Sequence, residues 1–137
     1  MTVPRRTLLA SAGIALCGVA GCLGGGSGGS AENLGGYDST TTDGRSVPLA
    51  PLSDAFEWYE SGRARFVDAR SRAAYRRSHV EGAVWSPARD GRERDDPVAE
   101  WDPDTLVVTY CGCPHHLSSM RAAALVDAGY ERVAALD

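Results

Sequence analysis

The sequence contains no lysine, and its 14 basic residues, all arginines, face 18 acidic residues. The formal net charge is therefore −4. Nucleic-acid binding needs a basic surface, so this acidic balance argues against a nucleic-acid partner. A long hydrophobic run is missing as well. The most apolar stretch, Leu8 to Ala20, has roughly 13 residues, whereas a helix that crosses a bilayer needs about 20.

The N-terminal segment resembles an export signal. Arg5 and Arg6 precede the short apolar stretch, which is the order of a secretory signal, and the string RRTLL resembles a twin-arginine signal. Small residues lead to Cys22 in the string VAGC, which resembles a lipobox. We expect residues 1–21 to be removed, lipid to be attached to Cys22, and the protein to be anchored on the outer face of the cytoplasmic membrane. The alternative is an ordinary signal with an incidental cysteine.

Residues 22–46 are rich in Gly, Ser and Thr and show no apolar period. This composition predicts a flexible tether. Residues 47–137 remain, which is enough chain for one small domain and too little for two.

Short apolar runs alternate with helix-like segments through residues 47–137, and this order predicts an α/β fold: a small parallel sheet with helices on both faces. The uninterrupted apolar run of Leu106 to Val108 within TLVVTY predicts a central strand. Pro48 suggests that Val47 to Leu49 form an edge strand. We expect helices capped by Ser53 and by Ser118 or Ser119. In the first helix, the residues available for burial are Phe56, Trp58 and Tyr59.

The string YCGCPHHLSS, residues 110–119, follows the predicted central strand and precedes a helix. Functional sites of parallel sheets lie at the carboxyl ends of strands, where helix N-termini also point. Helix N-termini and nearby positive charge favour the thiolate form of cysteine. His115 and His116 can add positive charge or hydrogen bonds when protonated. The sequence therefore predicts a nucleophilic cysteine, either Cys111 or Cys113.

Two other kinds of site stay open for this loop. Cys111, Cys113, His115 and His116 all suit zinc or copper, although structural zinc sites usually draw their ligands from two separated pairs. A disulfide between Cys111 and Cys113 is expected in an oxidising compartment. Across a single residue it would be strained and therefore labile.

The ordered motifs FVDAR, HVEGAVWSP and LVVTYC resemble the rhodanese-like domain, over essentially residues 47–137. The residues that carry the resemblance are Asp68, Arg70, Tyr75, His79, Gly82, Ala83, Pro87, Tyr110, Cys111, Ser119, Ala122, Ala123, Gly129 and Tyr130. The resemblance implies a sulfurtransferase that carries sulfane sulfur as a cysteine persulfide. It implies a small sulfur donor, a thiophilic acceptor and no organic cofactor, and we expect a monomer. Asp68, Arg70 and His79 would be structural residues.

The resemblance also assigns the loop and marks three departures. The residues expected to bind substrate are Gly112, His115, His116, Leu117, Ser118 and Ser119, with no metal. The family's loop length matches if counted from Cys113, whereas Cys111 follows the strand directly and is slightly favoured. The loop lacks an arginine or lysine, which puts thiosulfate in doubt as the donor. The family's final helix is absent before Asp137, so one face of the sheet would be exposed. A catalytically inert binding module is the remaining alternative.

Overall fold

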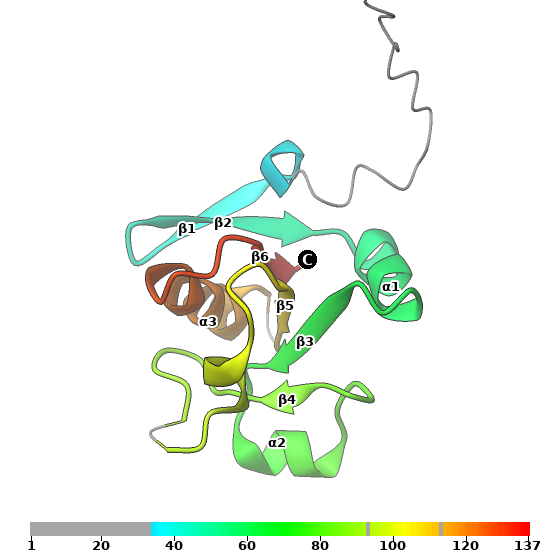
Figure 1. The fold of residues 1–137 in the computed structure, drawn as a ribbon, viewed down its shortest axis with the longest axis vertical. Coiled ribbons are helices and arrows are strands. Elements are labelled where there is room, and N and C mark those ends of the chain that lie inside the picture. Colours follow the sequence, from blue (N-terminus) through cyan, green and yellow to red (C-terminus); the bar gives the residue numbers. More distant parts are fainter. Residues whose placement is uncertain (1–33, 93, 113) are drawn as a thin grey trace, which may run out of the picture.

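The computed structural model describes residues 34–92, 94–112 and 114–137 (Figure 1). The predicted export signal of residues 1–21 and the predicted lipid site Cys22 lie outside these ranges, as does Cys113. Within the described ranges, no helix has the length and apolar character that a membrane crossing requires.

Six strands form one sheet in the order β1-β2-β6-β5-β3-β4 (Figure 1). The strands are β1 Ser39–Thr42, β2 Arg45–Ala50, β3 Ala64–Asp68, β4 Val84–Trp85, β5 Leu106–Tyr110 and β6 Val133–Leu136. Only the pairing of β1 with β2 is antiparallel, and the other four pairings are parallel. The prediction that TLVVTY forms a central strand is confirmed, because β5 lies between β3 and β6 and all its residues are buried.

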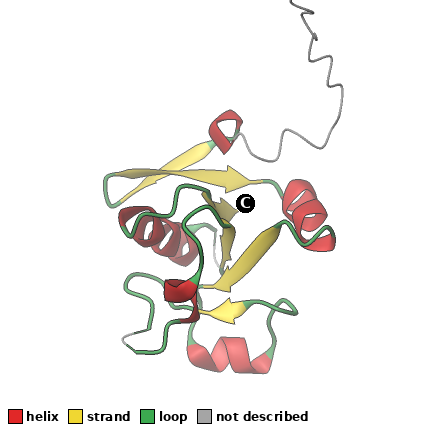
Figure 2. Ribbon diagram, viewed as in Figure 1, coloured by secondary structure: helices red, strands yellow, loops and turns green. Residues whose placement is uncertain are grey.

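The three helices are α1 Leu52–Glu60, α2 Arg72–Arg77 and α3 His116–Asp127, and short 3₁₀ turns occur at Leu34–Gly36 and Pro97–Glu100 (Figure 2). Helix α1 covers one face of the sheet, where Trp58 packs in a cluster with Val108. Helix α3 covers the other face, where Leu125 packs in a second cluster with Val107. Because neighbouring residues of β5 point to opposite faces, this confirms the predicted α/β fold with helices on both faces.

The predicted tether is wrong for residues 39–46, which form a β-hairpin with β2. Its turn consists of Asp43 and Gly44, with φ of 50° and 77°. Two residues at positive φ, often Asp-Gly, make the two-residue turn that best matches the twist of a hairpin. The threonines that precede the turn are β-branched and suit a strand. Strand structure therefore begins before the expected boundary at Val47.

Strand β2 is not the edge strand that Pro48 suggested, because it lies between β1 and β6. Proline is tolerated there because β6 pairs only with Leu49 and Ala50, beyond Pro48. The missing N–H of Pro48 therefore removes no bond of the β2–β6 ladder. The edge on this side of the sheet is β1.

The predicted helix caps are also wrong. Helix α1 follows Pro51 without a side-chain cap, and the hydroxyl of Ser53 donates to the Asp54 carboxylate instead. Helix α3 begins at His116, so Ser118 and Ser119 lie inside its first turn, where both are buried. A serine caps a helix from the position just before its first turn. Ser118 and Ser119 come after the first helical residue, and the Ser119 hydroxyl donates to the His116 carbonyl instead.

Two large apolar side chains of α1 are exposed. Of the three residues available for burial, Trp58 is buried, Tyr59 is half-buried and Phe56 is 59% exposed, and Leu52 is 67% exposed. A hollow of about 280 Å³ lies beside them, lined in part by Phe66 and Leu136. No helix follows β6 among the described residues.

Candidate functional site

The turn between β5 and α3 holds the candidate cysteines. Strand β5 ends at Tyr110, Cys111 follows it directly, and α3 begins at His116. Strands β3, β5 and β6 run parallel, so their carboxyl ends meet at the edge of the sheet that carries this turn. The turn thus lies where parallel sheets usually build their sites.

The thiol of Cys111 contacts the beginning of α3. Cys111 is half-buried, and its Sγ donates to Oγ of Ser118 at 3.5 Å. Ser118 is fully buried, and its carbonyl accepts a hydrogen bond from Oγ1 of Thr109 at 2.8 Å. The sulfur therefore contacts the first turn of α3 through Ser118, which is itself hydrogen-bonded to Thr109 of β5.

The first turn of α3 is electrostatically suited to a negative charge. The first N–H groups of a helix have no acceptor within the helix and carry the positive end of its dipole. The N-cap residue, His115, gives no side-chain cap bond to these groups. An anion that forms on the sulfur of Cys111 therefore lies beside a partial positive charge.

A buried carboxylate anchors the strand ends beneath the loop. Asp68 is fully buried and accepts from Arg70 through Nε at 3.0 Å, Nη2 at 2.8 Å and the backbone N–H at 2.9 Å. The hydroxyl of Tyr110 donates to the same carboxylate at 3.1 Å and accepts from the N–H of Val80 at 3.0 Å. Burial is the main cause that raises the pKa of Tyr110 to about 12, and the hydrogen bond to Asp68 raises the pKa of Arg70.

The other two predicted structural residues, Arg70 and His79, make further contacts. Nη2 of Arg70 donates to the carbonyl of Ser78 at 2.6 Å. The ring of His79 stacks on Tyr75 with 3.9 Å between centroids, and its Nδ1 lies 2.8 Å from the Tyr75 carbonyl. Arg70 also reaches the loop, since a Cβ on the exposed Gly112 would lie 3.8 Å from Cδ of Arg70. Asp68 and Arg70 thus connect separate segments, through Tyr110 and the Ser78 carbonyl, whereas His79 makes a local contact with Tyr75.

A cavity of about 440 Å³ opens beside the loop. Its loop and α3 residues are Pro114, His115, His116, Ser119 and Met120, and Cys111 is not among the lining residues. The opposite wall comes from Thr40, Thr41, Thr42 and Asp43 of the hairpin and from Arg89. Sequence reasoning missed this wall. The signal for the hairpin was the Asp-Gly pair between β-branched residues, while the polar sequence around Arg89 carries no comparable signal.

His115 is tied to the end of β6. Its Nε2 lies 3.1 Å from Oδ1 of Asp137 and its Nδ1 lies 3.4 Å from the carbonyl of Leu136. Its backbone has a left-handed φ of 53°. His116 is exposed at the start of α3, and its carbonyl accepts from Oγ of Ser119 at 3.1 Å. Leu117 is half-buried. The structure thus brings His115, His116 and Ser119 to the cavity, and Ser118 to Cys111.

No group of three or more histidine, cysteine, aspartate or glutamate side chains suited to a metal ion occurs in residues 34–92, 94–112 and 114–137. The described members of the metal hypothesis, Cys111, His115 and His116, do not form one. The fourth member, Cys113, lies outside these ranges, and so does the predicted disulfide.

The family model of the rhodanese-like domain matches residues 52–137. No curated protein matches the chain significantly. The human single-domain sulfurtransferase TSTD1 is 20% identical with a TM-score of 0.55, over 66% of this chain and 88% of that protein. The BH2092 protein from Bacillus halodurans is 24% identical with a TM-score of 0.55, over 64% of each chain.

A further similar structure is a persulfide form of EanB with ergothioneine, which is 21% identical with a TM-score of 0.50. The match covers 64% of this chain but only 24% of EanB, and the match to BH2092 also leaves more than a third of that protein uncovered. At these identities the structures show a shared fold. Since the family model spans well over half of the sequence, the chain belongs to the rhodanese-like domain family.

Proposed function

We propose that this domain transfers sulfane sulfur through a persulfide on Cys111. The observation that carries the proposal is the position of its sulfur, directly after β5 and 3.5 Å from Ser118 in the first turn of α3. The family adds support, because one protein of this fold is named a sulfurtransferase and another was solved in a persulfide form.

The chemistry proceeds in two displacements. The thiolate of Cys111 attacks the sulfane sulfur of a donor, a sulfur–sulfur bond forms, and the bond between that sulfur and the donor breaks. The donor leaves with the electron pair of the broken bond, and Cys111 carries a persulfide. An acceptor thiolate then attacks the outer sulfur, takes it away as its own persulfide, and restores the thiolate of Cys111. No external oxidant or reductant is needed.

The chain stabilises the charged states of this cycle. Both the thiolate and the persulfide are anions, and the first-turn N–H groups of α3 favour negative charge nearby. The cavity beside the loop offers room for donor and acceptor, and its lining includes His115 and His116. Arg89 supplies the positive charge that the loop sequence lacks. Its ion pair with Asp43 is long, at 3.9 Å, and exposed, so it leaves the guanidinium accessible to an anionic donor.

The test is the rate of sulfur transfer from a low-molecular-weight persulfide to a thiol acceptor, measured for the full chain and for Cys111→Ser and Cys113→Ser. We expect Cys111→Ser to lose transfer entirely and Cys113→Ser to keep most of it. Loss in Cys113→Ser alone would move the nucleophile to Cys113. No transfer by the unaltered chain would favour an inert binding module, and stoichiometric zinc without transfer would favour a metal site.

We further propose that the mature protein is exported and held at the outer face of the cytoplasmic membrane by lipid on Cys22. The support is the sequence alone: the arginine pair, the short apolar stretch and the small residues before Cys22. Cys22→Ser should move the protein from the membrane fraction to the soluble fraction after export. Retention of the variant in the membrane fraction would contradict lipid attachment.

A further inference from the structure

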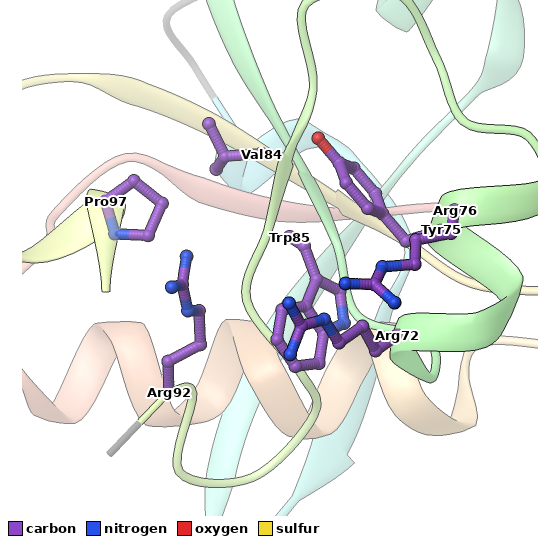
Figure 3. A pocket seen from close by; sticks show the side chains of 7 residues that line it. All are labelled: Arg72, Tyr75, Arg76, Val84, Trp85, Arg92 and Pro97. Carbon is purple, nitrogen blue, oxygen red and sulfur yellow. The ribbon is translucent and has the colours of Figure 1, made fainter. Parts of the chain in front are cut away.

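A second cavity, separate from the cysteine loop, lies between α2 and the edge strand β4 (Figure 3). It has a volume of about 270 Å³ and is lined by Arg72, Tyr75, Arg76, Val84, Trp85, Arg92 and Pro97. Arg72 and Arg76 come from α2 on one side, and Arg92 comes from the loop on the other side (Figure 3). Three guanidinium groups thus surround one small space in a chain whose net charge is negative.

Trp85 holds two of these arginines in place. Cζ of Arg72 lies 5.8 Å from the centroid of the indole ring, and Cζ of Arg92 lies 5.6 Å from it. Both distances fall within the range of cation–π attraction. The indole is itself fixed, because its Nε1–H donates to the carbonyl of Arg70 at 2.9 Å. The two guanidinium groups are therefore drawn toward one anchored ring.

The positive charge of this cavity is not neutralised within the described part of the chain, which omits Glu93. None of Arg72, Arg76 and Arg92 forms an ion pair there. Asp96 lies near, since it accepts from the backbone N–H of Arg92 at 3.1 Å. Its carboxylate is already bound by Arg121 at 3.1 Å and by the Ser86 hydroxyl. Three like charges around one cavity repel one another until an anion enters.

The geometry points to a binding site for a small multivalent oxyanion, such as a phosphate or sulfate group, between α2 and β4. Guanidinium groups present several N–H donors in one plane and bind such oxyanions in a bidentate manner. The cavity is slightly smaller than the roughly 300–1,000 Å³ typical of pockets for drug-sized ligands, which favours a small anion. The site does not involve Cys111, and it stands whether or not the loop transfers sulfur.

The experiment is a titration of the ¹⁵N-labelled full chain with sodium pyrophosphate at constant ionic strength. The indole N–H signal of Trp85 reports on the cavity and that of Trp101 serves as the internal reference. Trp101 is a suitable reference because it also has an arginine over its ring, Arg65 at 4.8 Å, but does not line this cavity. We expect a saturable shift of the Trp85 signal and at most a small, linear shift of the Trp101 signal.

Matched variants decide the outcome. The double variant Arg72→Gln, Arg76→Gln should weaken pyrophosphate binding at least tenfold, while Arg65→Gln, which removes an arginine from the other tryptophan, should leave it unchanged. A retained Trp85 signal shows that each variant is folded. Absence of a saturable shift, an equal loss in Arg65→Gln, or binding only of a hexaglutamate peptide would each overturn the proposal.

Discussion

The side chains of the anchor, Asp68 and Thr109, and those of the loop between β5 and α3 differ in burial and in hydrogen bonding. Asp68 and Thr109 are fully buried, and their side-chain oxygens are hydrogen-bonded to neighbouring strands, loops and α3. Gly112 and His116 of the loop are exposed, and the contact between Nε2 of His115 and the Asp137 carboxylate is partly solvated. The comparison separates stability from reactivity: substitutions in the anchor should lower the free energy of unfolding, whereas substitutions in the loop should change the chemistry and leave stability nearly intact.

The largest expected effect is that of Asp68→Ala. Removal of this carboxylate leaves Nε of Arg70 and the Tyr110 hydroxyl without their Asp68 acceptor. Breaking such a buried pair typically costs about 3–5 kcal/mol. Urea unfolding measures the change. The control is Asp43→Ala, whose ion pair with Arg89 is exposed and long and should contribute about 0–1 kcal/mol. Equal losses in the two variants would show that the anchor contributes no special stability.

A pH titration of stability sharpens the same comparison. Folding raises the pKa of Tyr110 from about 10 to about 12, so between these values the folded state binds more protons than the unfolded state. The contribution of Tyr110 is complete below pH 10 and is lost as the pH rises through 12. A shift of this size corresponds to at most about 2–3 kcal/mol.

Tyr110→Phe should therefore make the decline of unfolding free energy between pH 10 and 12 shallower. Part of the decline remains, because burial also raises the pKa values of Tyr37 and Tyr130. Tyr59→Phe, a half-buried position against Phe66, is the matched control. An unchanged slope in Tyr110→Phe would contradict the role given to this hydroxyl.

Thr109→Val tests the link between the anchor and α3. It removes the hydroxyl that donates to the Ser118 carbonyl at 2.8 Å while keeping the shape of the side chain. A hydrogen bond of this kind contributes about 1 kcal/mol. Thermal or urea unfolding should show that loss, and Thr41→Val on the exposed hairpin should stay within about 0.5 kcal/mol of the unaltered chain. A loss confined to Thr41→Val would reverse the comparison.

The smallest effect is expected at His115. Its φ of 53° is a conformation that glycine adopts without strain, and its side-chain contact with Asp137 is partly exposed. In His115→Gly, the relief of backbone strain offsets the lost contact with Asp137. We therefore expect the free energy of unfolding to change by less than about 1 kcal/mol. His115→Val also loses the contact with Asp137, and a β-branched side chain is strained at positive φ. This variant should therefore be clearly less stable than His115→Gly. Similar stabilities for the two variants would argue against a strained cap.

The sequence predicted the parts of the fold that are set by apolar runs. Within TLVVTY, Leu106, Val107 and Val108 form an uninterrupted apolar run, which favours a strand covered on both faces, and β5 is that strand. The hairpin at Asp43 and Gly44 was missed because its polar residues bury little surface, so composition suggested a tether. Strand β1 itself has no apolar residue, and its position depends on its pairing with β2.

The candidate site was predictable in part. The place of Cys111 at the end of β5 follows from the order of elements, and the resemblance pointed to Asp68 and Arg70. The wall formed by Arg89 and the tie between His115 and Asp137 depend on how distant loops pack, which a local pattern does not encode. The caps at Ser118 and Ser119 were misplaced because the helix begins earlier, behind a residue in the left-handed conformation.

The most direct test of the central claim is the intact mass of the protein after exposure to a sulfane donor and removal of excess reagent. The account predicts that the unaltered chain and Cys113→Ser each gain one sulfur atom, that a thiol acceptor removes it, and that Cys111→Ser gains none. The thermal stability of Cys111→Ser should match that of the unaltered chain. A sulfur adduct that persists in Cys111→Ser would contradict the assignment of the reactive sulfur to the junction of β5 and α3.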